Sequence, residues 1–260
     1  MITFAENIFM DYTIINLTPD NINTYPAVCF ISPQHQAYLS KKEWLIQRFS
    51  EGMKIKLLYE DNANKANAFI EYIPGNYAWR AVNAENYMFI HCIWVSPNKT
   101  KNKGYGSALI ECCEKDATEA GLKGVAVICS SGSFMADKHL FIKKGYKEVQ
   151  NYGKHSLMVK QFNESKLPEL NNTETALTQY QGLHIIYSCQ CPWVVRFIDE
   201  VKPFLKKMGI EPVVTQLMTA KQAQQAPSVY AVFNLVYNGQ LLADHYISTT
   251  RFENIMRKLK

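Results

Sequence analysis

A short turn between an apolar run and an amphipathic stretch constrains this chain more than any other feature. The turn reads Lys-Asn-Lys-Gly-Tyr-Gly-Ser over residues 101–107, between the almost continuously apolar segment 87–95 and a helical pattern that ends at Gly121. Such an apolar run indicates a central strand that is buried on both faces. Glycine at positions 104 and 106 allows positive φ and a close approach of the backbone to a ligand. The first amide groups of the following helix lack intrahelical partners, and the helix dipole is positive there.

This turn predicts an anion site of the kind that holds a pyrophosphate. Lys99, Lys101 and Lys103 add positive charge at its edge. The same G-x-G spacing also occurs in tight turns that bind nothing, so the spacing alone leaves both interpretations open.

Two motifs resemble those of the GNAT superfamily of acetyltransferases. The first is a strand, then [Q/R]-x-x-G-x-[G/A], then a helix. Gly104 and Gly106 match its two small positions, and Lys101 stands where glutamine or arginine is usual. The second is a short helix that ends in glycine and an aromatic residue before a strand, and HLFIKKGYKEV matches it with Gly145-Tyr146.

The resemblance covers about residues 1–162 and implies acetyl-CoA as the cofactor. It implies that backbone amides from about Lys103 to Ser107 bind the pyrophosphate, while the pantetheine arm pairs with the preceding strand, splayed by a bulge. The acetyl carbonyl would lie near Ile93, and the amine would attack from the other side of a V-shaped opening between segments 87–95 and 125–129. The expected cofactor-binding residues are Ile93, Trp94, Val95, Lys101, Lys103, Gly104, Tyr105, Gly106 and Ser107.

The acid that protonates the departing thiolate is left open by the resemblance. Many members of the superfamily use a tyrosine in the second motif, and Phe141 stands at that position here. Phenylalanine has no proton to donate. Tyr105, Tyr146, Ser130 or a water could replace the tyrosine, and the spacing does not choose among them.

The general base is equally open. His91 and Cys92 lie on the central strand and point to opposite faces, because side chains alternate along a strand. Glu71 and Glu85 are alternatives. A lone histidine on an apolar strand is more often structural than catalytic. The candidate catalytic residues of the whole chain are His91, Tyr105 and Cys191.

The elements predict an N-terminal α/β (α+β) domain at residues 1–163, with the GNAT fold and a mixed, largely antiparallel sheet. Besides the segments above, Ser40 and Glu43 are expected to form a capping box that starts a helix. The other expected elements are strands at 12–17, 54–59, 66–73, 146–149 and 155–159 and a helix at 138–144.

A polar stretch at residues 164–181 contains Pro168 and Asn171-Asn172 and is interpreted as a linker. A smaller domain at residues 182–260 follows. It reads β-α-β-(α)-β-β-α, with strands at 183–187, 212–217, 229–237 and 241–246 and helices at 191–209 and 252–259.

This second domain resembles a thioredoxin or glutaredoxin unit. Its order is βαβ-ββα, Cys191-Pro192-Trp193 resembles the start of a glutaredoxin motif, and Ala226-Pro227-Ser228 resembles the loop that faces that cysteine. Together with the N-terminal acetyltransferase motifs, this arrangement is similar to the YoaP-like family.

Cys191 is expected at a helix N-terminus, where the dipole lowers the pKa of a thiol. Val194 stands where the second cysteine of a redox motif would be, and Cys189 lies two residues before Cys191. Three interpretations stay open: a thiol that binds or reacts with a substrate, an inert recognition or dimerisation module, and a redox site. A C-x-C pair alone is weak evidence for a metal, so no metal is assigned.

Composition limits the function classes. The net charge of +5 is spread along the chain without a dense basic stripe, so nucleic acid is not an expected partner. A run of about 18 apolar residues, which a membrane span requires, does not occur, and the N-terminus does not resemble a signal peptide. Seven cysteines, an odd number, favour reduced thiols and a cytoplasmic location.

The predicted activity is direct transfer of an acetyl group from acetyl-CoA to a primary amine of a small molecule or peptide. The alternative is a thiol- or metal-handling or regulatory protein that uses Cys191 beside a degenerate acetyltransferase fold. The sequence does not identify the acceptor, and it leaves open whether the chain forms a homodimer.

Overall fold

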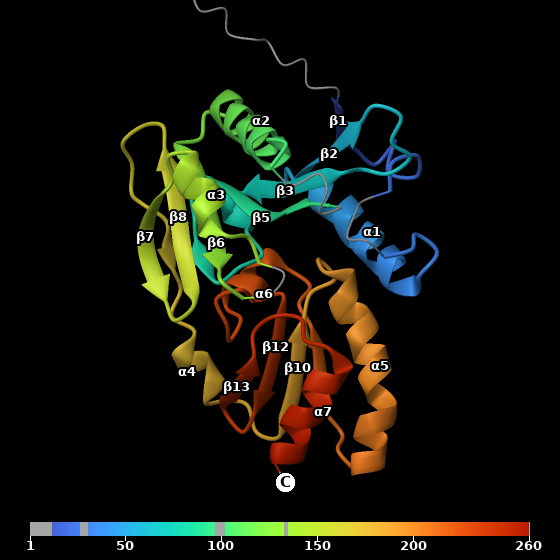
Figure 1. Ribbon diagram of the computed structural model, residues 1–260. Helices are drawn as coiled ribbons and strands as arrows, with labels where there is room; N and C mark the ends of the chain where they lie inside the picture. Colours follow the sequence, from blue (N-terminus) through green and yellow to red (C-terminus); the bar gives the residue numbers. More distant parts are fainter. Residues whose placement is uncertain (1–11, 27–30, 97–101, 133–134, 260) are drawn as a thin grey trace, which may run out of the picture.

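The computed structural model describes residues 12–26, 31–96, 102–132 and 135–259. Two sheets lie one above the other in Figure 1, the N-terminal one on top and the C-terminal one beneath it. Helices α1 (Gln36–Phe49) and α5 (Pro192–Met208) come from the two halves and pack against each other. Among the described residues, none of the helices combines the length and the apolar character that crossing a membrane requires.

The N-terminal sheet has seven strands in the order β1-β2-β3-β5-β6-β8-β7. All neighbours are antiparallel except β5 and β6, which are parallel, so the expected mixed, largely antiparallel sheet is confirmed. The strands are β1 Tyr12–Leu17, β2 Lys54–Glu60, β3 Ala68–Pro74, β5 Met88–Val95, β6 Gly124–Ser130, β7 Lys147–Tyr152 and β8 His155–Gln161.

The helices of this half differ from the prediction at one end. α2 (Tyr105–Glu119) and α3 (Lys138–Lys143) lie where helices were expected. The predicted start of the first helix at Ser40 is wrong: α1 begins four residues earlier, after an N-cap at His35, whose ring accepts the N–H of Ala37. Inside the helix, the Ser40 hydroxyl instead donates to the Gln36 carbonyl. A histidine cap is uncommon, so the capping-box pattern misplaced the start.

Two strand edges separate in the middle of this sheet. β5 and β6 pair only from Met88↔Val125 to Ile90↔Val127. On its other edge β5 stays paired with β3, but the register shifts so that Glu71 faces Cys92 and Tyr72 faces Ile90. His91 is therefore the extra residue of a β-bulge, which bends the strand. The splayed strands and the bulge, both expected from the resemblance, are present.

The C-terminal sheet has the order β11-β10-β12-β13, with β10 and β11 parallel and the other pairs antiparallel. Edge-to-face contacts of Phe197 with Phe233 and Phe252 pack α5 against the sheet and α7. Here the structure corrects three boundaries: the strand expected from 229 starts at Phe233 with 229–232 in a loop, the strand expected at 241–246 ends at Ala243, and the helix expected at 252–259 starts at Thr249. The elements are β10 Leu183–Tyr187, β11 Val213–Gln216, α6 Ala220–Gln224, β12 Phe233–Tyr237, β13 Gln240–Ala243 and α7 Thr249–Lys258.

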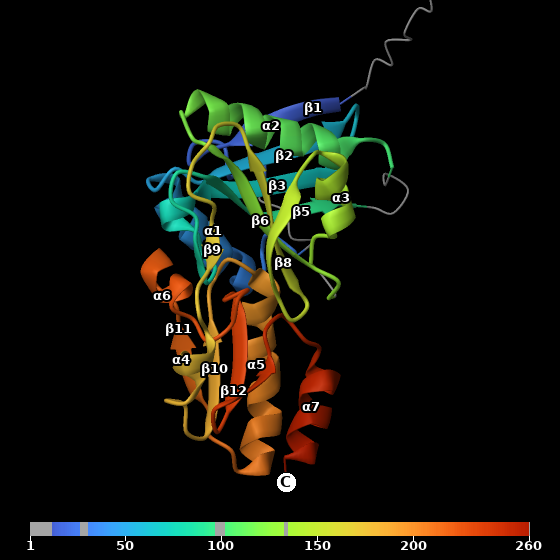
Figure 2. The ribbon, with the colours of Figure 1, turned by 90° about the vertical axis from the view of Figure 1, so that its left-hand side faces the viewer.

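The segment between the sheets has structure of its own. It contains β9 (Glu169–Leu170) and the short helix α4 (Glu174–Leu177). β9 pairs with β4 (Val82–Asn83), which follows the short 3₁₀ helix η1 (Gly75–Tyr77) of the N-terminal half. The turned view in Figure 2 shows β9 running beside the N-terminal half and β10 beneath it.

The two halves share a core and backbone hydrogen bonds. Trp44 and Trp79 of the N-terminal half meet edge to face and belong to one buried cluster with Cys189 and Leu217 of the C-terminal half. The Ala81 N–H donates to the Val229 carbonyl across the interface at 3.1 Å. The loop before β12 is thereby held against the N-terminal sheet.

Candidate active site

The predicted anion-binding turn ends in a helix N-terminus whose first amides have no partner within the helix. Gly104 is the N-cap of α2 with φ of 82°, a conformation that favours glycine. The first hydrogen bond of the helix runs from the Ala108 N–H to the Gly104 carbonyl. The N–H groups of Gly106 and Ser107 therefore precede the hydrogen-bonded ladder and point out of the helix end. Lys101, also assigned to this site, lies outside the described residues.

Gly106 is required by packing as well. A Cβ built on it would lie 3.3 Å from Leu140 Cδ2 of α3, closer than most such contacts. The absence of a side chain lets α2 approach α3. The geometry of the glycine turn thus depends on the packing of α3, which belongs to the second motif.

Tyr105 and Lys103 both turn toward β2. The Tyr105 hydroxyl donates to Glu60 Oε1, and Lys103 Nζ lies 2.7 Å from the same oxygen. The Tyr105 ring also meets Tyr12 edge to face. These contacts place the hydroxyl on the β1–β2 side of α2. A catalytic role for Tyr105 stays a prediction, and its known partners do not support it.

The opening between β5 and β6 contains a small enclosed space. Ile93, Trp94 and Val95 pair with β3 along one edge of β5, beyond the point where pairing with β6 ends. Ile93 lines the space itself, whereas Trp94 and Val95 pack against the two hydrophobic clusters on either side of the sheet. The residues around this space are Ile90, His91, Cys92, Ile93, Val127, Ile128, Ala136 and Tyr230. Tyr230 comes from the C-terminal half.

His91 is held as a neutral hydrogen-bond acceptor. Its Nε2 accepts the Trp79 N–H at 2.8 Å, and its Nδ1 lies 3.5 Å from Glu71 Oε1. Burial lowers the pKa of His91 to about 4, because the charged ring loses its hydration. The proton of the neutral ring is therefore on Nδ1. Since the Nε2 lone pair is occupied, this geometry weighs against His91 as general base, and its catalytic role stays a prediction.

Glu71, an alternative base, sits in a buried ion pair. It pairs with Lys41 of α1, and both side chains are almost fully buried. Burial alone would raise the pKa of Glu71, but Lys41 and then His91 outweigh it and lower that pKa to about 2. The carboxylate is ionised at neutral pH. The other alternative, Glu85, is exposed in the turn before β5.

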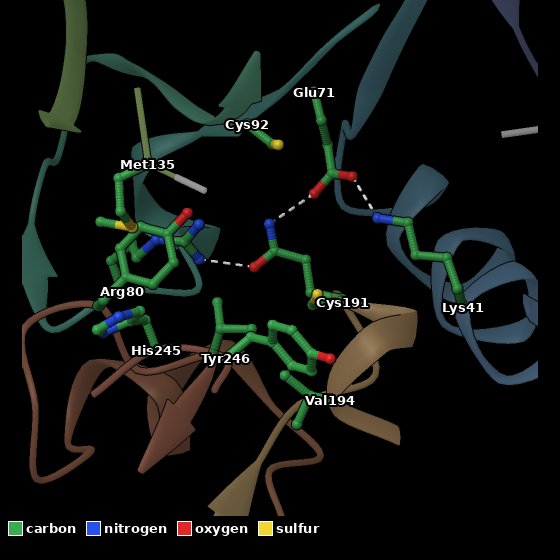
Figure 3. Close-up of a pocket in the computed structure, with 12 residues that line it drawn as sticks. Lys41, Glu71, Arg80, Cys92, Met135, Cys191, Val194, His245 and Tyr246 are labelled. Carbon is green, nitrogen blue, oxygen red and sulfur yellow. Dashed lines mark hydrogen bonds and ion pairs between the residues drawn. The ribbon is translucent and has the colours of Figure 1, made fainter. Parts of the chain in front are cut away.

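A chain of hydrogen bonds runs from Glu71 into the C-terminal half. Gln190 Nε2 donates to Glu71 Oε1 at 2.8 Å, and Gln190 Oε1 accepts from Arg80 Nη1 at 2.6 Å. Figure 3 shows the chain from Lys41 through Glu71 to Arg80. Arg80 also donates to the carbonyls of Trp79 and His91, both at 2.7 Å.

These residues border a pocket between the two sheets. Its cavity volume is about 90 Å³, that of a small pocket. The Arg80 guanidinium lies 4.0 Å from the centre of the Tyr230 ring, and Tyr230 borders both this pocket and the space between β5 and β6. The pocket is lined by Lys41, Glu71, Arg80, Cys92, Met135, Gln190, Cys191, Val194, Tyr230, Val232, His245 and Tyr246 (Figure 3).

Cys191 lines the pocket, but the expectation of a lowered pKa is wrong. It is the N-cap of α5, as predicted. Burial raises the pKa of its thiol, and the N–H groups of Val194 and Trp193 only partly oppose this. Cys189 and Cys191 are both free thiols, and Cys189 packs in the shared core. Among the described residues, His, Cys, Asp and Glu side chains form no group of three that could hold a metal ion.

The relatives of the chain identify its family. Over 252 residues it is 30% identical to the N-acetyltransferase YoaP of Bacillus subtilis strain 168, which covers 94% of this chain and 98% of that protein. A sequence model of the acetyltransferase (GNAT) family matches residues 20–146. This chain belongs to the GNAT acetyltransferase family. A model of the YoaP-like family matches residues 213–254.

Solved structures of GNAT acetyltransferases also align with the chain. The PaiA N-acetyltransferase of Thermoplasma acidophilum, in complex with coenzyme A, is 16% identical, with a TM-score of 0.42 over 59% of this chain and 100% of that one. The ribosomal-protein-S18-alanine N-acetyltransferase of Escherichia coli is 17% identical, with a TM-score of 0.39 over 60% and 96%.

The sequence of this GNAT acetyltransferase predicts the glycine turn and the splayed strand, but it gives little sign of the pocket between the sheets. The glycine turn and the splayed strand were named, and Glu71 and Cys191 were among the candidates. Lys41, Arg80, Gln190 and Tyr230 were missed. Only Tyr230 had a signal, since it follows the Ala226-Pro227-Ser228 loop that was expected to face Cys191.

Proposed function

We propose that this chain transfers the acetyl group of acetyl-CoA directly to the primary amine of a small molecule or peptide. One observation carries the proposal: in a GNAT family member, a glycine-capped helix N-terminus follows a strand that splays from its neighbour at a bulge. Acetyl-CoA supplies the thioester, whose C–S bond breaks as the new N–C bond forms.

The residues of the cradle fit the cofactor. The amides of Gly106 and Ser107 at the N-terminus of α2 suit a pyrophosphate, because they are preorganised donors at the positive end of a helix dipole. Lys103 adds a half-exposed cation beside them. The β5 edge at Ile93 to Val95, which has left β6, would pair with the pantetheine amides.

The amine would enter through the pocket between the sheets. This pocket and the space between β5 and β6 share Cys92 and Tyr230, so the two adjoin at the bulge. An amine at this junction would meet the thioester from the side opposite the cradle. Holding the two reactants in this geometry is the main contribution that direct transfer requires from a protein.

Tyr230 is the phenol best placed to protonate the departing thiolate. Phe141, at the family's usual position, is buried against Tyr146, and the Ser130 hydroxyl accepts the Gly132 N–H. Burial raises the pKa of Tyr230 to about 12, against a smaller opposing effect of Arg80. The phenol is therefore protonated at neutral pH and has a proton to donate.

The C-terminal half then serves as the wall of the acceptor pocket. Its strand order and its βαβ-ββα succession support a thioredoxin-like unit. Cys191, without a second thiol in its motif and with a raised pKa, contributes a pocket surface rather than redox chemistry. We retain a cytoplasmic location for the enzyme.

The test is calorimetric titration of acetyl-CoA into the wild type, Gly104→Glu and Gly209→Glu. Gly104→Glu puts an anion beside the cradle. Gly209 also has positive φ (67°) and open space around it, but it lies at the far end of α5, so Gly209→Glu is a matched control for charge and backbone strain. We expect micromolar binding to the wild type and the control, and loss of binding in Gly104→Glu. A folded wild type that does not bind acetyl-CoA would overturn the proposal.

A further inference from the structure

The acceptor pocket holds three buried charged side chains whose charges do not cancel. Lys41, Glu71 and Arg80 are 2%, 1% and 1% exposed. Lys41 and Glu71 neutralise each other as an ion pair. Arg80 has only neutral acceptors: within the described part of the chain it bonds three amide oxygens and forms no ion pair with a carboxylate. The pocket wall therefore carries one positive charge in excess.

This excess charge is permanent, because a guanidinium in a protein does not lose its proton. A buried charge without a counter-ion is unfavourable. The carbonyls around Arg80 and the Tyr230 ring stabilise it only as dipoles and a quadrupole. An anionic group in the pocket would complete its coordination, and a planar carboxylate matches the fork of a guanidinium.

The side-chain carboxamide of a single residue, Gln190, is long enough to bridge Glu71 and Arg80. Gln190 spans them, donating to Glu71 and accepting from Arg80. A molecule with an amine and a nearby carboxylate presents the same two functions, a donor toward Glu71 and an acceptor toward Arg80. Such a molecule could replace the contacts of Gln190 or lie alongside them.

Glu71 also lies beside the β5 bulge, where the proposed acetyl transfer takes place. It pairs with Cys92 in the β3–β5 ladder, directly beside the bulge at His91. An amine that donates to Glu71 is thus held at the mouth of the opening between β5 and β6. Before it attacks, the amine must lose a proton; the uncompensated charge of Arg80 favours the neutral amine, whereas the Glu71 carboxylate favours the ammonium form.

We propose that the acceptor is a small amine that also carries a carboxylate, as an α-amino acid does, with the carboxylate on Arg80 and the amine on Glu71. The wall of Cys92, Met135 and Val194 favours an apolar side chain. The amine nitrogen forms a bond to the acetyl carbon, the C–S bond breaks, and the sulfur takes up a proton, so the products are an N-acetyl amino acid and coenzyme A. This inference rests on the proposed function.

The experiment measures coenzyme A release from acetyl-CoA with matched acceptor pairs. The pairs are L-phenylalanine with phenethylamine and L-leucine with isopentylamine, which differ only in the carboxylate. We expect kcat/KM to be higher by about 100-fold for the amino acid of at least one pair, as for a buried charge pair that is lost. Equal or faster turnover of both carboxylate-free amines would overturn the inference.

Arg80→Gln tests the residue. We expect the ratio within the pair to fall to about one in this variant, chiefly through KM, and to recover in part in Arg80→Lys. Arg48→Gln is the control, since Arg48, like Arg80, is buried and lies over an aromatic ring (Trp79), but it does not line the pocket. A ratio that persists in Arg80→Gln would contradict the role of Arg80.

A second measurement needs no variant. Competition of N-acetyl-L-phenylalanine and N-phenethylacetamide for the wild type should favour the carboxylate-bearing product, and equal inhibition would count against the inference. Failure of the proposed function is distinct, because acetyl-CoA would then not bind. If acetyl-CoA binds and the enzyme acetylates only amines without a carboxylate, such as spermidine, the proposed function stands and this inference falls.

Discussion

The proposed cofactor cradle and the proposed acceptor pocket are built in opposite ways. The cradle is local: residues 102–104 make a turn, and the first residues of α2 supply the donors. The proposed acceptor pocket is assembled from α1, β3, the loop before β4, β5, the loop before α3, α5 and three loops of the C-terminal half. A local site can be recognised in a short motif, whereas an assembled one depends on the packing of distant segments. The cradle therefore depends on the conformation of its backbone and on its two glycines, whereas the pocket depends on the identity of its side chains.

The largest effect should come from breaking the buried pair on the acceptor side. Glu71→Gln leaves Lys41 as a second uncompensated buried cation, and we expect a loss of about 3–5 kcal/mol in the free energy of unfolding. Urea denaturation measures it. Glu119→Gln removes an exposed partner of Lys115 and should cost less than about 1 kcal/mol. Similar losses in both variants would show that the Lys41–Glu71 pair is not shielded from water.

Tyr230→Phe should affect turnover without affecting cofactor binding, because Tyr230 lies at the pocket and not at the cradle. We expect kcat to fall by about 100-fold, since general acid catalysis by a positioned group contributes at least that much. The Kd of acetyl-CoA should not change, because the cradle is unaffected. The assay uses the amino acid that the wild type acetylates fastest. An unchanged kcat would show that another group, or water, protonates the thiolate.

The lowered pKa of His91 should make the free energy of unfolding depend on pH. The pKa of His91 in the folded chain is about 4, below its value of 6.5 in an unfolded chain. Its contribution to stability is therefore complete above about pH 6.5 and is lost as the pH falls toward 4, because the unfolded state binds the proton more readily. The urea midpoint of the wild type should fall over this range. His91→Gln should remove part of that slope, and an identical slope in the variant would contradict the assignment.

Cys191→Ser should have the smallest effect. The thiol has a raised pKa and serves as wall, so we expect acetyl-CoA affinity to stay the same and kcat/KM to change by less than about 10-fold. A total loss of turnover in a folded variant would restore the thiol to the chemistry and break the division between cradle and pocket.

The sequence could predict the sheet and the cradle, because alternation, apolar runs and the glycine turn are short-range patterns. It placed the bulge by resemblance, and β5 bulges at His91. It misplaced the start of α1, because the cap is a histidine. It could not reveal that Arg80 meets Gln190, which lies 110 residues further along. The sequence does not distinguish a buried arginine such as Arg80 from an exposed one, because burial depends on the packing of distant segments. Tyr230 lies in a segment whose sequence predicts a strand, although the structure has a loop there.

The pairing of β9 with β4 has a mechanical consequence. The connecting segment is bound by Asn171, whose N–H donates to the Ala81 carbonyl and whose side-chain amide donates to the Gln224 carbonyl. The segment is therefore hydrogen-bonded to both halves of the molecule and is not a flexible linker. The buried core of Trp44, Trp79 and Cys189 is continuous across the junction of the two halves. We therefore expect the two sheets to unfold in one cooperative transition, so that the proposed cofactor cradle and the proposed acceptor pocket are lost together.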